Sequence, residues 1–364
     1  MVGRARYAAP TGGMTRSILA LLASLTAFSG FPDSYPAELQ APPGYLLEAP
    51  GLRELGPEDL ATRPGSFPFP VGERLVYEVR YFGVPVGPAT LEVARLVELE
   101  GRRYVHLVAT ARTNEFWTAL FRVDDRSEAF VDLESGRVAR SRTRTLHGRK
   151  EAREEIRYDW DTHFVHVRKV KVEKASVRDL AFDFGPFVHD VFDAFYALRR
   201  VPFREGLEIE LPVYASRKIH GFRVRAAGPR ELAIPALGAA PVATLELAPY
   251  DTIDGEPHAV GNGRVYVLAG DSRVPVLVDG WFRFTDFIRI GGVSAELVEW
   301  QRGRSDWPAA PAQPWRPPPV APASVEGRPR WEPPPAVAAA RERTGTREYE
   351  HKLRLEVREI SAAR

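Results

Sequence analysis

The fold of this chain is constrained most by a long series of short segments in which apolar and polar residues alternate. In residues 75–81 the odd positions are apolar, whereas Glu78 and Arg80 occupy the opposite face of an extended chain. A period of two is typical of a β-strand with one solvated face. Strands do not alternate with helices, so the sequence does not favour a parallel sheet. The expected strands cover residues 75–81, 89–96, 104–111 and 121–131, a meander over 137–177, and residues 208–214, 219–225, 243–247, 264–268, 275–284 and 292–300.

One segment, residues 185–200, has the period of a helix instead. Its apolar residues recur at three- and four-residue steps along one stripe, and they are Val188, Val191, Phe192, Phe195 and Leu198. Pro186 suits a first helical turn, and Pro202 ends the segment. Because an apolar stripe has to be buried, we expect the strands to wrap around this short helix.

The bulk composition limits the classes of function. Hydrophobic residues make up 44% of the 364 residues, which is enough for a packed core. The 50 basic and 48 acidic residues give a formal net charge of +2, so no overall field favours nucleic acid as a partner. The sequence has no cysteine, which excludes disulfides, thiolate metal sites and cysteine nucleophiles.

Changes in composition divide the chain into four parts. Residues 1–30 are predicted to be a signal peptide, because Arg16 precedes an apolar run, Ile18 to Phe28, that is shorter than the ~20 residues of a membrane helix. Residues 31–66 are predicted to be a Pro-rich linker, and residues 67–301 an antiparallel β domain. Residues 302–364 are predicted to be a Pro/Trp-rich tail that ends in a short strand or a short helix.

The meander over residues 137–177 is rich in basic residues. They are Arg140, Arg142, Arg144, Arg149, Lys150, Arg153, Arg168, Lys169, Lys171 and Lys174. One interpretation is a basic surface for anionic lipid head groups, polysaccharide or phosphorylated sugars. The other is the solvated face of strands, where charges discourage edge pairing and nearby glutamates neutralise part of the field. The sequence leaves both open.

No motif indicates a catalytic residue, a metal or a cofactor. Residues 292–296 lack the second glycine of a Gly-x-Ser-x-Gly elbow, and residues 261–263 are typical of a hairpin turn. His189 and Asp193 form the one histidine–carboxylate pair at helical ligand spacing, which alone does not define a metal site. Structural roles are expected for Asp190 and Arg199 as capping or buried partners, and for the turn aspartates Asp124, Asp125, Asp251, Asp254 and Asp271.

Aromatic residues give the strongest indication of a binding site. They gather in residues 182–196, and a second group surrounds Trp117. If these rings pack together they form part of the core, whereas if helix and sheet leave space between them they line an apolar cavity for an acyl chain or a similar group. The predicted ligand-binding residues are Phe182, Phe184, Phe187, Phe192, Phe195, Tyr196 and Trp117.

Three parts of the chain resemble a known bacterial family, the domain of unknown function 3108. Residues 69–79 with 83–87 resemble its opening strand pair, residues 190–206 its central helix and following turn, and residues 270–275 its late hairpin. The resemblance covers roughly residues 67–300. It implies an exported envelope protein, periplasmic or associated with the outer membrane. It also implies antiparallel β structure. By analogy with lipoprotein-carrier folds, we expect a mainly β fold, an antiparallel curved sheet or partly closed barrel around one short central helix. The composition predicts disordered N- and C-terminal tails. The resemblance implies no activity.

These observations predict a non-enzymatic, exported bacterial envelope protein that binds or carries an apolar or amphiphilic, lipid-like ligand. The first alternative is a polysaccharide-acting hydrolase that uses the turn carboxylates. The second is a structural or interaction protein of the envelope, in which the tail over residues 302–364 binds an envelope protein partner. No nucleic acid partner is expected.

Overall fold

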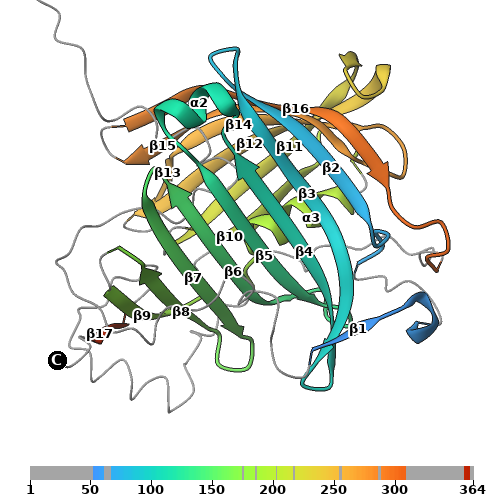
Figure 1. Ribbon diagram of the computed structural model, residues 1–364. Coiled ribbons are helices and arrows are strands. Elements are labelled where there is room, and N and C mark those ends of the chain that lie inside the picture. Colours follow the sequence, from blue (N-terminus) through green and yellow to red (C-terminus); the bar gives the residue numbers. More distant parts are fainter. Residues whose placement is uncertain are drawn as a thin grey trace, which may run out of the picture.

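The alternating segments form strands that belong to one 17-stranded sheet (Figure 1). The computed structural model describes residues 52–60, 67–173, 176–184, 187–201, 203–215, 218–253, 256–285, 288–308 and 356–360. Every ladder between the described strands is antiparallel. The predicted mainly β, antiparallel fold is therefore confirmed. The predicted signal peptide and most of the two predicted disordered tails lie outside the described residues.

The strands follow one another as hairpins in two series. The first contains β1 (Arg53–Leu55), β2 (Glu73–Tyr81), β3 (Val84–Leu99), β4 (Arg102–Arg112), β5 (Asp124–Asp132), β6 (Val138–His147), β7 (Lys150–Asp159), β8 (Phe164–Lys171) and β9 (Ser176–Asp183). The second contains β10 (Glu208–Ala215), β11 (Lys218–Ile234), β12 (Gly238–Ile253), β13 (Glu256–Ala259), β14 (Gly261–Leu268), β15 (Pro275–Thr285) and β16 (Ile288–Arg302). Because β16 pairs with β2, the two series form one continuous sheet.

The sheet curves so that its two series form opposite walls, with helix α3 (Val191–Arg199) between them (Figure 1). Among the described strands, β9 and β10 do not pair with each other; β9 pairs instead with β8 and with β17 (Glu356–Ile360), so the end of the chain forms a strand. The chain enters the interior beside β10, where the amide of His189 donates to the carbonyl of Pro212 (2.8 Å). The barrel is thus only partly closed.

Helix α3 is shorter than the predicted helix over residues 185–200. Its N-cap is Asp190, whose Oδ1 accepts a hydrogen bond from the amide of Phe192 (3.1 Å). The predicted start at residue 185 is wrong, because His189 forms a bridge with Val213 of β10 and cannot be helical as well. Residues 185 and 186 lie outside the described ranges.

A second helix, α2 (Glu115–Leu120), precedes β5 and was not predicted. The side chain of Asn114 caps it by accepting a hydrogen bond from the amide of Trp117 (3.0 Å). The expected strand over residues 121–131 therefore begins only at Asp124. An asparagine followed by a glutamate is a helix-start signal, but the helix is too short to show a periodic apolar pattern.

Segments on both sides of the predicted β domain also belong to the folded structure. Strand β1, in the predicted linker, pairs with β3, and Leu55 and Leu60 are buried in a hydrophobic cluster with Phe67. In the predicted tail, the amide of Arg304 donates to the carbonyl of Val71 (2.9 Å), and Trp307 is buried in the same cluster. Residues 53–60 and 303–307 thus add to the core.

Candidate functional site

Helix α3 buries its charged residues and leaves its aromatic side partly accessible. The residues predicted to form a buried stripe on this helix, Val191, Phe192, Phe195 and Leu198, all keep part of their surface exposed. The buried residues are Asp193, Ala194, Tyr196, Ala197 and Arg199. The predicted stripe is therefore only partly buried: Val188, just before the helix, is fully buried, and the other four residues pack against buried clusters with part of their surface exposed. A helix enclosed by a curved sheet contacts protein on several sides, and charged residues can be buried where they find partners.

The C-terminal end of α3 is held by a buried ion pair. Arg199 donates from Nη1 to Oε2 of Glu73 (2.6 Å) and from Nη2 to Oε1 (2.9 Å), and the two side chains are 1% and 4% exposed. The guanidinium also lies 4.1 Å from the centroid of the Phe69 ring. Burial lowers the pKa of Arg199, but the Glu73 carboxylate outweighs this effect and raises the pKa above its ordinary value. The sequence indicated Arg199 as a buried partner and gave no sign of Glu73.

The N-terminal end of α3 is fixed by two further polar contacts. Asp190, besides capping the helix, accepts a hydrogen bond from the hydroxyl of Tyr158 (3.2 Å), which confirms its predicted structural role. Nδ1 of His189 lies 2.7 Å from Oδ2 of Asp193, and both residues are buried. Burial raises the pKa of Asp190 to about 6. Within the described ranges, no group of three histidine or carboxylate side chains is arranged to hold a metal ion.

Four aromatic side chains form the apolar part of the candidate site. We call Trp117, Phe121, Phe192 and Phe195 the aromatic group. All four pack against one buried cluster that includes Ala109 and Ala111 of β4, and all four remain partly exposed. The indole Nε1 of Trp117 donates to the carbonyl of Pro85 (3.1 Å), which fixes the ring. Rings that are held in place and still accessible offer apolar surface to a ligand.

A row of polar side chains crosses the sheet beside the aromatic group. We call Ser127, Thr143, Glu154 and Lys169 the polar row, because they lie directly opposite one another on β5, β6, β7 and β8. Ser127 is in turn opposite Ala109, whose cluster supports the aromatic group. Since alternate residues of a strand share a face, the polar row lies on the inner face of the sheet. Along this line the inner face of the sheet therefore changes from an apolar residue on β4 to polar residues on β5 to β8.

The polar row is internally hydrogen-bonded. Oγ of Ser127 and Oγ1 of Thr143 are 3.0 Å apart, and Nζ of Lys169 donates to Oε2 of Glu154 (2.8 Å). On the same face of β5, the buried carboxylate of Asp125 lies 2.8 Å from Nε2 of His147. Burial raises the pKa of Asp125, although the hydrogen bond with His147 opposes this effect. Hydroxyl groups retain donor and acceptor capacity, so the row can bind the polar end of a ligand.

Three of the seven predicted ligand-binding residues, namely Trp117, Phe192 and Phe195, pack against the same large buried cluster. Phe184 belongs to a different buried cluster, and Phe187 lies beside Trp160, with ring centroids 5.5 Å apart. Tyr196 is buried between Phe69 (5.3 Å between centroids) and Phe195 (6.0 Å). The side chain of Phe182 lies outside the described residues. The aromatic side chains before and after Asp190 contact different parts of the core, because helix α3 begins after this residue.

Several of the basic residues noted in β6 and β7 are paired with glutamates. Arg144 and Arg153 both donate to Glu151 (3.3 and 2.8 Å), and Arg140 and Arg157 both donate to Glu155. These pairs support the interpretation of a solvated strand face.

Comparison with known proteins identifies a family. A family model described as a protein of unknown function (DUF3108) matches residues 76–284, and no curated protein matches the chain. Among the described residues, no helix is both long and apolar enough to cross a membrane.

Three solved structures are similar to parts of the chain. A β-barrel-like protein of the domain of unknown function DUF1849 from Brucella abortus is 12% identical with a TM-score of 0.41, covering 64% of this chain and 98% of that one. A candidate exported protein with a YmcC-like fold from Bacteroides fragilis is 10% identical with a TM-score of 0.25, covering 65% and 99%. A candidate lipoprotein from Parabacteroides distasonis is 10% identical with a TM-score of 0.23, covering 65% and 98%. Similarity at this level supports no functional inference.

Proposed function

The chain belongs to the DUF3108 family of proteins of unknown function, and from this premise we propose that it is an exported bacterial protein that binds an amphiphilic, lipid-like molecule. The molecule lies between helix α3 and the inner face of the sheet, and no reaction is catalysed. Its acyl part contacts the aromatic group, and its polar end contacts the polar row.

This proposal is supported by the partial exposure of two aromatic rings on α3. The helix buries Asp193 and Arg199, which are costly to remove from water, and leaves Phe192 and Phe195 partly accessible. A helix that served only to fill the core would bury the rings first, because each ring contributes more to stability when it is fully removed from water. Accessible rings inside a curved sheet are therefore better explained by a ligand that covers them.

The polar row favours an amphiphile over a pure hydrocarbon. Ser127 and Thr143 are buried or nearly so, on the same inner face as the alanines that support the aromatic group. Specific small-molecule sites combine a mostly apolar lining with a few placed polar groups. Export is supported by the sequence alone, since Arg16 and the apolar run from Ile18 to Phe28 have the pattern of a signal peptide.

Two measurements test the proposal: identification of any molecule that the purified protein carries, and a binding assay with a fluorescent fatty acid. The full chain is purified after export from a bacterial host, and native mass spectrometry identifies any bound molecule. We expect an acyl-containing molecule. Binding of a fluorescent fatty acid is then measured for Phe192→Ser, with an expected loss of affinity of about ten-fold from the lost apolar contact.

Phe164→Ser is the matched control, because this partly exposed ring on β8 faces away from its buried neighbours Val165 and Val167 and so lies on the outer face of the sheet. It should bind the fluorescent fatty acid as the wild type does. A wild-type chain that carries no acyl compound and does not bind the probe would contradict the proposal, as would equal losses in the two variants.

A further inference from the structure

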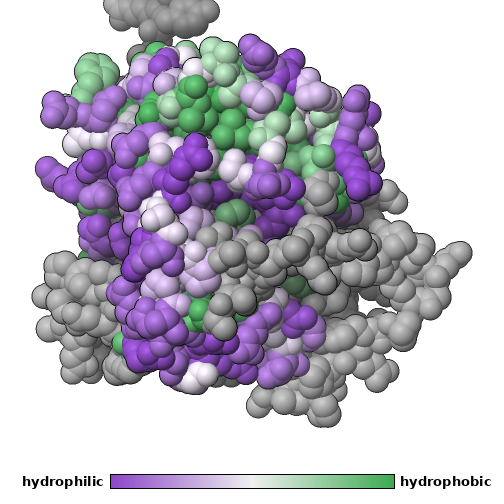
Figure 2. Space-filling model, turned by 90° about the vertical axis from the view of Figure 1, so that its right-hand side faces the viewer, coloured by the Kyte–Doolittle hydropathy of each residue, from purple (hydrophilic) through white to green (hydrophobic). Residues whose placement is uncertain are grey.

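The end of the barrel where β2 turns into β3 carries a group of exposed apolar side chains. We call Phe82 (69% exposed), Val84 (50%), Phe116 (68%) and Leu120 (65%) the apolar rim. The first two belong to the β2–β3 turn and the last two to α2, which lie together at the upper end in Figure 1. Nδ2 of Asn114, which caps α2, donates to the carbonyl of Pro85 next to the turn (3.1 Å). The rim is therefore one surface rather than scattered residues, and apolar surface also gathers toward this upper end in Figure 2.

The tip of the rim is held in a strained backbone conformation. Phe82 has φ of 48° and Gly83 has φ of 79°, so both central residues of this two-residue turn are left-handed. Such turns favour asparagine and glycine, and a bulky residue at this position costs on the order of 1–2 kcal/mol. The Phe82 ring contacts Tyr81 (4.6 Å between centroids), but most of its surface is exposed, so only part of this cost is offset within the chain. A strained and exposed aromatic residue indicates a contact with something outside the chain.

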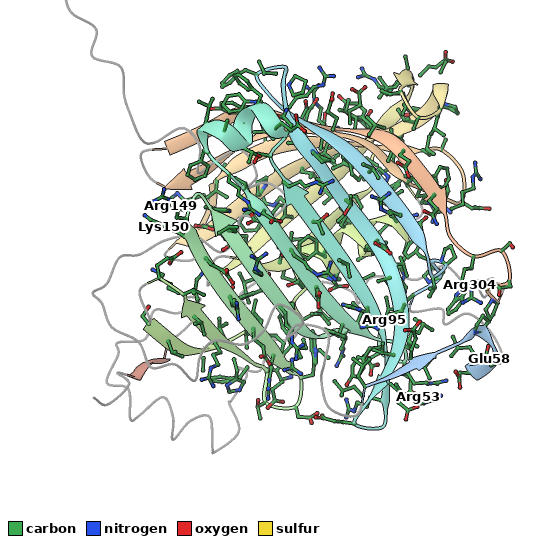
Figure 3. All side chains as sticks on the ribbon, in the orientation of Figure 1. Arg53, Glu58, Arg95, Arg149, Lys150 and Arg304 are labelled. Atoms are coloured by element: carbon green, nitrogen blue, oxygen red, sulfur yellow. The ribbon has the colours of Figure 1, made fainter. Side chains whose placement is uncertain are left out.

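Basic residues surround the rim. Arg112 and Arg122 flank α2 on either side, and both are exposed. The amide of Gly148 donates to the carbonyl of Arg122 (2.6 Å), which brings the β6–β7 turn with Arg149 and Lys150 to this end of the barrel (Figure 3). Arg149 and Lys150 are exposed and form no ion pair with any described residue.

The acidic side chains at this end only partly offset the basic ones. Glu115 lies in the first turn of α2, and Asp124 is paired with Arg122 (3.0 Å). The four basic residues around the rim therefore exceed these two carboxylates.

We propose that this end of the barrel docks on the surface of a bilayer that contains anionic lipids. The apolar rim inserts at the level of the upper acyl chains, and the basic residues contact the head groups. A second copy of the chain is less suitable as an occupant, because two basic rims would repel each other. Helix α2 carries Phe116 and Leu120 of the rim and also Trp117, so docking places Trp117 beside the bilayer. The inference does not depend on the identity of an internal ligand.

The test is flotation of the full chain with vesicles of phosphatidylcholine alone or mixed with phosphatidylglycerol. We expect binding to the anionic vesicles that weakens as salt is raised. In the variant Phe116→Glu with Leu120→Glu, partitioning should fall about a hundred-fold, as follows from the transfer free energies of two apolar side chains. In Arg149→Ser with Lys150→Ser, it should fall about thirty-fold.

Leu237→Glu is the matched control, because Leu237 is a 37% exposed residue at the tip of the β11–β12 hairpin. That tip lies at the other end of the strands. Leu237 precedes β12, whose Val242 pairs with Leu268 at the end of β14. The rim instead follows Tyr81, which pairs with Val293 in the first half of β16. Leu237→Glu should bind vesicles as the wild type does. Urea unfolding and far-UV circular dichroism that match those of the wild type show that the Phe116→Glu, Leu120→Glu variant is folded.

Three results would overturn the inference. The wild type could fail to bind anionic vesicles, the rim variant could bind as the wild type does, or Leu237→Glu could lose as much binding as the rim variant. A wild-type dimer that the rim variant dissociates, without vesicle binding by either, would assign the rim to a second copy of the chain. Any of these results would leave the fatty-acid measurement of the proposed function unaffected.

Discussion

Glu73, the first residue of β2, and Arg199, the last residue of α3, form a two-point ion pair inside the protein, with N–O distances of 2.6 and 2.9 Å. The pair connects two elements that are 126 residues apart in sequence. Because both groups are charged and buried, each would be strongly destabilising without the opposite charge of its partner. The pair therefore fixes the end of α3 against the sheet and, through it, the position of Phe195.

Breaking this pair should be strongly destabilising. We expect Glu73→Gln or Arg199→Met alone to lower the free energy of unfolding by about 3–5 kcal/mol, since each leaves one buried charge unpaired. The double variant Glu73→Leu with Arg199→Met leaves no charge and should recover most of the loss. Urea unfolding measures all three. If the double variant loses as much free energy of unfolding as the two single variants together, the interpretation as an ion pair is contradicted.

The buried cap of α3 gives a pH dependence with a definite sign. Asp190 has a pKa of about 6 in the folded protein, against 3.8 as its ordinary value, so the folded state binds more protons between these values. Stability contributed by this group is therefore present at low pH and is lost as the pH rises through this range.

Asp190→Asn keeps an oxygen that can cap the helix and never becomes charged. We expect the variant to match the wild type below the ordinary pKa and to be more stable at neutral pH by on the order of 2–3 kcal/mol. Urea unfolding at the two pH values checks this. A variant that is less stable than the wild type at neutral pH would show that the charged carboxylate is favourable in the fold.

The docked start of the C-terminal tail should matter for stability. Trp307 is 7% exposed and belongs to the cluster that contains Phe67 and Tyr196. We expect Trp307→Ala to lower the free energy of unfolding by about 3 kcal/mol. The control is Arg304→Ala, whose exposed side chain is paired with Asp306 and should contribute less than about 1 kcal/mol. Equal effects in thermal or urea unfolding would show that the indole is not part of the core.

The polar row should distinguish amphiphiles from hydrocarbons. Thr143→Val keeps the shape of the side chain and removes the hydroxyl that lies 3.0 Å from Ser127. We expect the affinity for a fluorescent fatty acid to fall about five- to ten-fold, from the loss of one hydrogen bond, while binding of an uncharged hydrocarbon probe stays unchanged. If both probes lose affinity equally, Thr143 acts through the fold and not through the polar end of the ligand.

The architecture could be predicted from the sequence because local pattern decides it. The alternation in residues 75–81 identified β2 within two residues, and the helical spacing of Phe192 and Phe195 identified α3. The boundaries were less predictable, since β11 runs to Ile234 through Gly228 and Pro229, where the alternating pattern is interrupted and the register against β12 shifts. Helix α2 and β1 were missed because segments of six and three residues carry no period.

The candidate site was only partly predictable, because it depends on strand register. The polar row follows from the pairing of Ser127 with Thr143 and of Thr143 with Glu154, which no single strand reveals. The partner of Arg199 could not be identified either, since Glu73 was one of many glutamates beside apolar residues. The sequence predicted the aromatic residues as one group. Phe195 and Phe184 lie in different clusters because of the strand register and because α3 begins after Asp190, and neither can be seen in the sequence.

We predict that the accessible rings of α3 contact the apolar part of a ligand, and photo-crosslinking detects this contact. The wild-type chain is loaded with a fatty acid that carries a diazirine on its acyl chain, irradiated, digested with trypsin and analysed by mass spectrometry. We predict labels on the peptides over residues 113–122 and 179–199, which contain Trp117 and Phe192. Labels confined to other peptides, or labelling that excess unlabelled fatty acid does not suppress, would contradict the claim.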